Sequence, residues 1–231
     1  MKCKTTILTT LLFLIVVYSP CFAKTLFSED FSKGASRWDV GSGKWEVKNG
    51  EYVQMTTDTF LNSFVKEAEW DLAWTEYTLE LKAKKLGGAE GWDIVFGIAK
   101  GDKVPAIKDD RGTMTFYDWN IAGWANTRSV LRKRVKGAGS NVFETQVGNT
   151  VENDKWYNIK VKVNPGRIVG YLDDEQAFDV NEGPAEGRIG FSLFGTSAVF
   201  DDIIVYDEGG PLAVSPTEKL ATAWGEIKRQ K

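Results

Sequence analysis

Apolar and polar residues alternate along most of this chain. In Tyr77–Lys84 the apolar side chains fall on one face and the charged side chains on the other, and Tyr157–Val163 repeats this period of two. A strand with one apolar face is typical of an antiparallel sheet that covers a core on one side. The same pattern predicts further strands at Thr25–Asp30, Trp45–Lys48, Glu51–Met55, Trp92–Ala99, Met114–Ile121, Ser129–Val135, Arg167–Leu172, Arg188–Phe194 and Ala198–Tyr206.

Turn signals separate these segments. Asn49-Gly50 lies between two short apolar runs and predicts a hairpin, because both central residues of a type I′ turn need positive φ. Asn164-Pro165-Gly166 marks a second tight connection. Many short strands, with no long helical period before residue 215, favour an all-β fold. We expect one concanavalin-like jelly-roll β-sandwich of two antiparallel sheets over residues 24–207.

The N-terminus has the pattern of a secretory signal. Lys2 and Lys4 precede an apolar run over residues 7–17, and small residues in Cys21-Phe22-Ala23 suit a cleavage site. The apolar run is too short to span a bilayer, which takes about 20 residues. Residues 1–23 are therefore predicted to be a signal peptide cut after Ala23, which would make the protein secreted or periplasmic.

The C-terminus has a helical pattern instead. Ser215-Pro216-Thr217-Glu218 combines an N-cap serine, a proline at the first helical position and a capping-box glutamate. Residues 208–231 are predicted to be a linker and a short amphipathic helix. Its apolar stripe either packs back onto the sandwich or, alternatively, recruits a protein partner through residues 215–231.

Composition restricts the chemistry. The chain has no histidine, which excludes Ser-His-Asp and Cys-His catalysis and zinc sites that need imidazole. Its two cysteines, Cys3 and Cys21, both lie in the predicted signal, so we expect no disulfide in the domain. A net charge of −3 argues against nucleic-acid binding, which usually leaves a basic excess.

An unusual aromatic and amide-rich string runs from Tyr117 to Ser129. Sugars stack their C–H faces on aromatic rings, and Asn, Asp and Arg side chains bind vicinal hydroxyl groups. This composition therefore predicts a glycan-binding face. Its candidate residues are Tyr117, Trp119, Asn120, Trp124, Asn126 and Arg128, although either tryptophan alone could equally be a core residue.

A second candidate segment precedes the string. Glu90 and Trp92 fall on one face by alternation, with Asp93 on the other. If the two strands are neighbours, Glu90 and Trp92 would extend the glycan-binding face. In the alternative, Trp92 joins the core.

These motifs resemble a known family. Glu90-Gly91-Trp92, Trp119-Asn120-Ile121 with Gly123-Trp124, and Asn126-Thr127-Arg128 are similar to strings in concanavalin-like jelly-roll domains of glycan-active bacterial proteins. The similarity includes the domain appended to α-L-arabinofuranosidases and the 3-keto-disaccharide hydrolase domain family, and it covers about residues 25–207. The later Gly187–Phe191 and Phe200–Ile203 strings mark only the fold. The resemblance implies glycan recognition on the concave sheet, without implying hydrolysis.

Catalysis has weaker support in the sequence. Jelly-roll glucanases carry a Glu-x-Asp-x-x-Glu strand that places two carboxylates on one face, and this string is absent. Glu90 and Asp118 are the remaining candidates for an acid and base. We therefore expect non-catalytic carbohydrate binding, with hydrolysis of a 3-keto disaccharide as one alternative and an envelope scaffold that uses the C-terminal helix as another.

Two charged groups complete the candidates. Glu29 and Asp30 in the first strand, with Asp201 and Asp202 in the last, could hold a structural calcium ion or be ordinary edge acids. No cofactor is otherwise expected. The basic residues after the aromatic string would either meet uronate or sulfate groups or form a solvated face; they are Arg128, Arg132, Lys133, Arg134 and Lys136.

Overall fold

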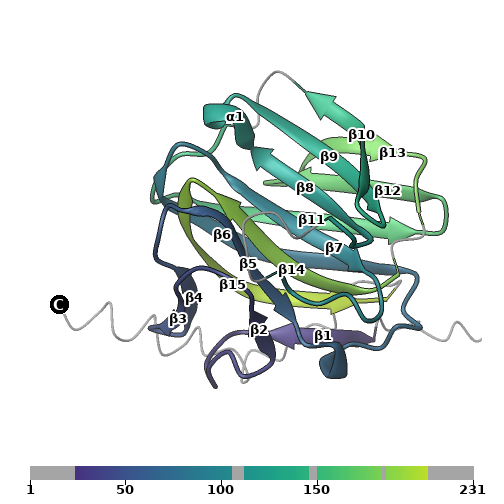
Figure 1. Ribbon diagram of the computed structural model, residues 1–231, viewed down its shortest axis with the longest axis horizontal. Helices are drawn as coiled ribbons and strands as arrows, with labels where there is room; N and C mark the ends of the chain where they lie inside the picture. The colour runs from purple at the N-terminus through teal and green to yellow at the C-terminus, as the bar shows by residue number, and fades with distance from the viewer. Residues whose placement is uncertain (1–23, 106–111, 146–149, 184–185, 208–231) are drawn as a thin grey trace, which may run out of the picture.

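Two antiparallel sheets pack face to face in the computed structural model, which describes residues 24–105, 112–145, 150–183 and 186–207 (Figure 1). The eight-stranded sheet has the order β13-β12-β11-β6-β15-β4-β3, with β1 paired to β15. Its strands are β1 (Thr25–Glu29), β3 (Trp45–Lys48), β4 (Glu51–Gln54), β6 (Tyr77–Gly88), β11 (Trp156–Asn164), β12 (Arg167–Leu172), β13 (Glu175–Val180) and β15 (Thr196–Tyr206).

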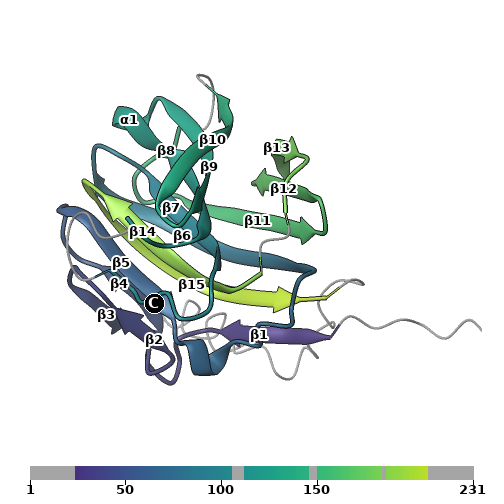
Figure 2. The same cartoon turned by 45° about the vertical axis from the view of Figure 1, so that its right-hand side comes forward.

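The second sheet has seven strands in the order β10-β9-β8-β7-β14-β5-β2. They are β2 (Trp38–Val40), β5 (Thr59–Val65), β7 (Trp92–Ile98), β8 (Phe116–Ala122), β9 (Arg128–Val135), β10 (Ala138–Thr145) and β14 (Arg188–Phe194). Two short helical turns, η1 (Glu67–Glu69) and α1 (Gly123–Asn126), complete the described elements. Figure 2 shows β8 to β10 with α1 in one layer and β11 to β13 in the other. The predicted jelly-roll sandwich is confirmed.

Alternate side chains of both sheets form the core. The Phe191 ring of β14 stacks on the Phe200 ring of β15 with centroids 3.9 Å apart, which joins the two sheets at their centre. Trp92 of β7 also contacts Tyr157 of β11 across the core, with ring centroids 6.0 Å apart. Burial of such large rings is the main stabilising contribution in a sandwich without disulfides.

The predicted turns have the backbone that their residues favour. Asn49 and Gly50, between β3 and β4, have φ of 54° and 81°. Asp173 and Asp174, between β12 and β13, have φ of 49° and 66°. Positive φ at both central residues matches the right-handed twist of the paired strands.

The first and last described strands lie side by side. Thr25 pairs with Tyr206, and Glu29 pairs with Ile203. Beyond this pairing, the backbone N–H of Lys24 donates to Asp207 Oδ1 at 2.6 Å. The predicted signal peptide and C-terminal helix lie outside the described residues, and within the described part no helix has the length and apolarity needed to cross a membrane.

Candidate functional site

Two rows of side chains cross the outer face of the seven-stranded sheet, the face directed away from the eight-stranded sheet. Strand pairing aligns the first row in the order Asn62, Ser192, Asp93, Asn120 and Val130. Pairing aligns the second row in the order Phe64, Gly190, Val95, Asp118 and Arg132. Because neighbouring strands lie about 4.8 Å apart, each row places one side chain every 5 Å or so across the sheet.

An ion-paired cluster joins the two rows. Arg132 donates to Asp118 Oδ2 from Nε at 2.9 Å and from Nη2 at 2.5 Å, and its Nη2 lies 3.5 Å from Asp93 Oδ2. Asn120 Nδ2 donates to the other oxygen of Asp93. Burial alone would lower the pKa of Arg132, but the charges of Asp118 and Asp93 raise it above its usual value. The guanidinium therefore stays charged and holds both carboxylates in place.

Several polar atoms of the first row have no hydrogen-bond partner within the described structure. They are Asn62 Oδ1, Ser192 Oγ and Asn120 Oδ1, and all three atoms are buried. Buried polar atoms in folded proteins are nearly always hydrogen-bonded. These atoms give the outer face unused hydrogen-bonding capacity.

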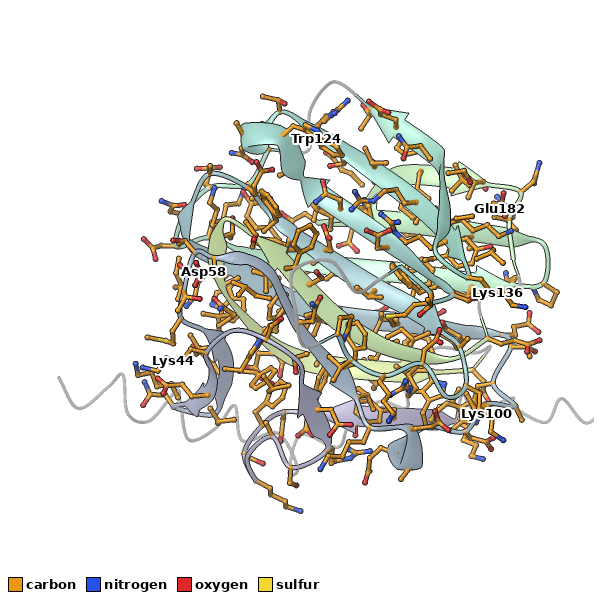
Figure 3. All side chains as sticks on the ribbon, in the orientation of Figure 1. Lys44, Asp58, Lys100, Trp124, Lys136 and Glu182 are labelled. Carbon is orange, nitrogen blue, oxygen red and sulfur yellow. The ribbon has the colours of Figure 1, made fainter. Side chains whose placement is uncertain are left out.

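Trp124 stands at the rim of the outer face, on the α1 turn that follows β8 (Figure 3). Its side chain is 42% exposed. The Arg128 guanidinium carbon lies 3.6 Å from the centroid of the indole, and Arg128 Nη1 is 2.5 Å from Glu144 Oε1. The Arg132 guanidinium carbon lies farther off, 6.0 Å from the same centroid. The exposed part of the indole remains available to a ligand.

A second exposed aromatic side chain lies at the same end of the sheet. Phe194, which ends β14, is 46% exposed and meets Phe60 edge-on, with centroids 5.4 Å apart. It follows Ser192 by two residues and therefore shares its face. The candidate residues predicted from the sequence did not include Phe194, Ser192, Asp93 or Asn62. Alternation in β7 puts Asp93 on the other face of the sheet from Trp92. This was the sequence signal that could have identified the outer face.

Trp92 and Trp119 do not lie on the predicted glycan-binding face. Both are fully buried in the core between the sheets. The reason is the period of two: Trp119 and Asn120 are consecutive in β8, so they point to opposite faces. Tyr117 shares the inner face with Trp119 and is also buried, and its hydroxyl donates to Glu182 Oε2 at 3.2 Å. For Trp92 and Trp119 the core alternative was correct, and the expectation that Tyr117 lies on the glycan-binding face was wrong.

Asn126 and Glu90 lie close to Trp124 but have partners in the backbone. The Asn126 side chain accepts from Val151 N at 2.8 Å and donates to Val151 O at 3.0 Å. Glu90 Oε1 accepts from Ala125 N at 2.9 Å. Of the predicted ligand-binding residues, Asn120, Trp124 and Arg128 lie on or at the rim of the outer face.

The structure does not bring Glu90 and Asp118 together as a carboxylate pair. Asp118 pairs with Val95, which is five residues beyond Glu90 along β7. At about 3.3 Å per residue this offset is roughly 16 Å along the strand, whereas glycosidase carboxylates lie about 5–9.5 Å apart. Asp118 is also fully buried and bound to Arg132. The predicted acid and base therefore do not form a glycosidase pair.

The four acids predicted to hold calcium do not converge. Glu29 accepts from Phe31 N at 3.1 Å, and Asp30 accepts from Ser32 Oγ at 2.7 Å. The Lys82 ammonium is 2.7 Å from Asp202 Oδ2 and supplies the positive charge there. In the part of the chain that the structure describes, no three His, Cys, Asp or Glu side chains form a metal-binding group.

Three of the basic residues after the aromatic string form ion pairs within the chain. Arg128, Arg132 and Arg134 lie on one face of β9, as alternation predicts, but Arg128 and Arg132 bind carboxylates of their own chain. Lys133 points the other way and lies 2.7 Å from Glu182. These contacts leave Arg128 and Arg132 less able to bind uronate or sulfate groups.

The chain is similar to carbohydrate-active proteins in sequence and in structure. It is 37% identical over 153 residues to the extracellular exo-α-L-arabinofuranosidase of Streptomyces chartreusis, a match that covers 66% of this chain and 16% of that protein. The chain thus spans about a sixth of that relative, and the resemblance to an arabinofuranosidase domain is confirmed. No family model matches the chain, so membership of the 3-keto-disaccharide hydrolase domain family stays a prediction.

Solved structures show the same fold. The carbohydrate-binding module CBM66 from Bacillus subtilis has a TM-score of 0.55 at 20% identity and covers 72% of this chain and 93% of its own. The family GH16 endo-β-1,3(4)-glucanase SCLam has a TM-score of 0.56 at 12% identity, covering 82% and 92%. The VIP36 exoplasmic/lumenal domain, bound to Ca²⁺ and mannose, has a TM-score of 0.59 at 8% identity, covering 79% and 87%. The chain has a concanavalin-like jelly-roll fold.

Proposed function

We propose that the protein binds carbohydrate without cleaving it, on the outer face of the seven-stranded sheet. One observation carries this proposal: an exposed indole, Trp124, stands at the rim of a row of buried polar side chains with unused hydrogen-bonding capacity. A ligand for such a face needs an apolar surface for the ring and several hydroxyl groups beside it. A sugar residue meets both requirements.

Each part of the site has a role in this proposal. The exposed part of the Trp124 indole stacks on the C–H face of one sugar ring, while Arg128 behind the indole keeps the ring in position. Asn120 and Ser192 form hydrogen bonds to sugar hydroxyl groups once their side chains turn outward, because their oxygens are buried in this structure. Phe194 offers a second apolar contact at the same rim.

The relatives support a carbohydrate ligand. The Streptomyces chartreusis protein is named an arabinofuranosidase, and similar folds occur in a carbohydrate-binding module and a glucanase. A binding role for this chain agrees with the separation of Glu90 from Asp118. The name of the same relative includes the word extracellular, which supports the predicted export of this chain. Sequencing the N-terminus of the exported protein tests that point, and we expect it to begin at Lys24.

Affinity electrophoresis on immobilised plant and algal polysaccharides tests the binding proposal. We expect the protein to be retarded on at least one neutral glycan, and Trp124→Ala to abolish the retardation. Trp156→Ala is the matched control, because Trp156 also lies beside a cation, Lys84 Nζ at 4.5 Å, but belongs to the eight-stranded sheet. Retardation that Trp156→Ala removes and Trp124→Ala preserves would place binding elsewhere, and no retardation on any glycan would contradict the function itself.

A further inference from the structure

We infer that Glu90 and Asn126 are positioning residues that hold Trp124 in its ligand-ready orientation. This inference rests on the proposed function, because it assigns the two side chains a role through Trp124. It also replaces the roles expected from the sequence, in which Glu90 was an acid or a ligand contact and Asn126 bound sugar hydroxyls.

The turn that carries Trp124 has an unfavourable backbone. Ala122, Trp124, Ala125 and Asn126 have φ of 59°, 49°, 58° and 64°, all in the left-handed region. For residues other than glycine and asparagine this conformation is unfavourable, because Cβ crowds the backbone. Three such residues within four positions need contacts from outside the turn that exclude the relaxed alternatives.

Glu90 supplies one of these contacts. Its carboxylate accepts from Ala125 N at 2.9 Å, in the middle of the left-handed stretch. The backbone of the same segment is fixed as well, because Glu90 O accepts from Thr196 Oγ1 at 2.6 Å and Gly91 N donates to Ala122 O at 2.8 Å. The Glu90 carboxylate, on a fixed backbone, therefore binds the backbone N–H of Ala125, the residue that follows Trp124. Charge makes this hydrogen bond stronger than a neutral one.

Asn126 supplies the other contact, to a different segment of the chain. Its side-chain amide forms two hydrogen bonds to the backbone of Val151, much as a neighbouring strand residue would. Val151 is buried in the core, so the far end of the turn is anchored to a rigid point. Asparagine also tolerates the left-handed region better than most residues do.

The two contacts hold Ala125 and Asn126, the two residues that follow Trp124. Within the turn, Thr127 Oγ1 donates to Trp124 O at 2.7 Å and Thr127 N donates to Gly123 O at 3.0 Å. Removing Glu90 or Asn126 leaves these local bonds but permits the backbone to leave the left-handed region. The indole would then sample several orientations, and a ligand would lose affinity by the free energy needed to restore one of them.

Glu90→Ala and Glu90→Gln separate positioning from other roles. We expect Glu90→Ala to weaken binding of the retained polysaccharide by about tenfold, because preorganisation is lost. Glu90→Gln keeps the Oε1 acceptor and should stay within about threefold of the parent protein, since it loses only the charge. Asn126→Asp, which keeps the acceptor for Val151 N and loses the donor, should lie between the parent protein and Asn126→Ala.

A second substitution at Ala125 provides a rescue. Glycine adopts positive φ without strain, so Ala125→Gly should return part of the affinity that Glu90→Ala loses, about threefold or more. The indole N–H signal of Trp124 in a ¹H–¹⁵N spectrum should broaden in Glu90→Ala and sharpen in the double variant. A general loss of folding would change all the tryptophan signals together, and Ala125→Gly would not reverse the affinity loss.

The outcomes distinguish this inference from the proposed function. If Trp124→Ala abolishes binding while Glu90→Ala and Asn126→Ala leave affinity unchanged, the positioning role is wrong and the binding function stands. If Glu90→Gln binds as poorly as Glu90→Ala, the carboxylate itself contacts the ligand, and the positioning role is again wrong. If Trp124→Ala has no effect, the proposed function fails before Glu90 is considered.

Discussion

The indole of Trp119 meets the ring of Phe178 edge-on, with centroids 5.0 Å apart and planes at 89°. Trp119 belongs to β8 and Phe178 to β13, so this contact joins the two sheets. Phe143 of β10 packs against the same Phe178 ring at 5.7 Å. Of the two tryptophans predicted in the aromatic string, Trp119 is thus part of the interior, and Trp124, five residues later, is the exposed one.

This difference in burial predicts that substituting the two tryptophans changes stability by different amounts. Trp119→Ala should destabilise the fold by about 3–5 kcal/mol, because it removes a fully buried ring. Trp124→Ala should change the free energy of unfolding by about 1 kcal/mol or less, because its side chain is 42% exposed and lies at the rim of the sheet rather than in the core. Urea denaturation followed by circular dichroism measures both. Equal losses in the two variants would contradict the assignment of Trp124 to the surface.

The buried ion pair of Arg132 should contribute more to the stability of the fold than an exposed ion pair does. Arg132→Met leaves Asp118, which is fully buried, without this guanidinium and should cost about 2–4 kcal/mol. Arg167→Met is the matched control, because Arg167 makes two hydrogen bonds to Asp179 on the surface, at 2.8 and 2.5 Å, and its loss should cost clearly less. Similar losses of thermal stability in the two variants would refute this ranking.

Gly123 should tolerate no side chain. A methyl group there would overlap Asn120 Oδ1, so Gly123→Ala must displace either Asn120 or the Trp124 turn. We expect a loss of about 1–3 kcal/mol from this overpacking, together with weaker glycan binding. Gly87→Ala is the control, since a methyl group there would lie 3.7 Å from Ser197 Oγ, an ordinary contact. Unchanged melting temperature and binding in Gly123→Ala would show that the turn is looser than described.

Asp201 should make stability depend on pH. Burial raises the pKa of its carboxyl from 3.8 to about 6. Between these values the folded protein holds a proton that the unfolded chain has lost, so the contribution of this group to stability falls as pH rises from about 4 to above 6. Asp201→Asn should remove that decline and stabilise the protein at pH 8 by about 1–2 kcal/mol, after allowance for solvent screening.

Asp202→Asn provides the comparison for this prediction. Asp202 is exposed and paired with Lys82 at 2.7 Å, and its charge raises the pKa of Asp201 less than burial does, so Asp202→Asn should weaken the decline between pH 4 and 6 only in part. Thermal melts across that range distinguish the two variants. A profile for Asp201→Asn that keeps the decline of the parent protein would contradict burial of the carboxyl as its cause.

Alternation identifies most clearly the strands whose two faces differ in environment, although β7 and β14, which are buried on both faces, were predicted too. Alternation marks β6 and β11, which cover the core on one side and meet solvent on the other. It fails for β5, whose last five residues are all buried, because side chains on its two faces contact different apolar clusters. It also fails for β10, an edge strand that is mostly exposed. A period of two reports only a contrast in environment, and these strands have little contrast.

The candidate site was predicted in part for a related reason. The string Tyr117–Ser129 has a composition that suits sugars, but composition does not distinguish the faces of β8. Strict alternation along β8 puts Asp118 and Asn120 on one face and Trp119 on the other. Applied to the string, it would have assigned Trp119 to a different face from Asn120. The left-handed backbone at Trp124 and Ala125 has no local sequence signal, since neither residue favours positive φ. It depends on Glu90 and Val151, which are distant in the sequence.

The antiparallel pairing of β1 with β15 means that the chain enters and leaves the sandwich at one place. Two hydrogen bonds join Lys24 and Asp207 across that point: Asp207 N donates to Lys24 O at 3.1 Å, and Lys24 N donates to the Asp207 side chain. A host polypeptide could therefore accept the whole sandwich at a single surface loop without having its own ends forced apart. By the same geometry, a short linker from residue 207 to residue 24 would close the sandwich and permit new termini at an exposed hairpin such as Asn49-Gly50.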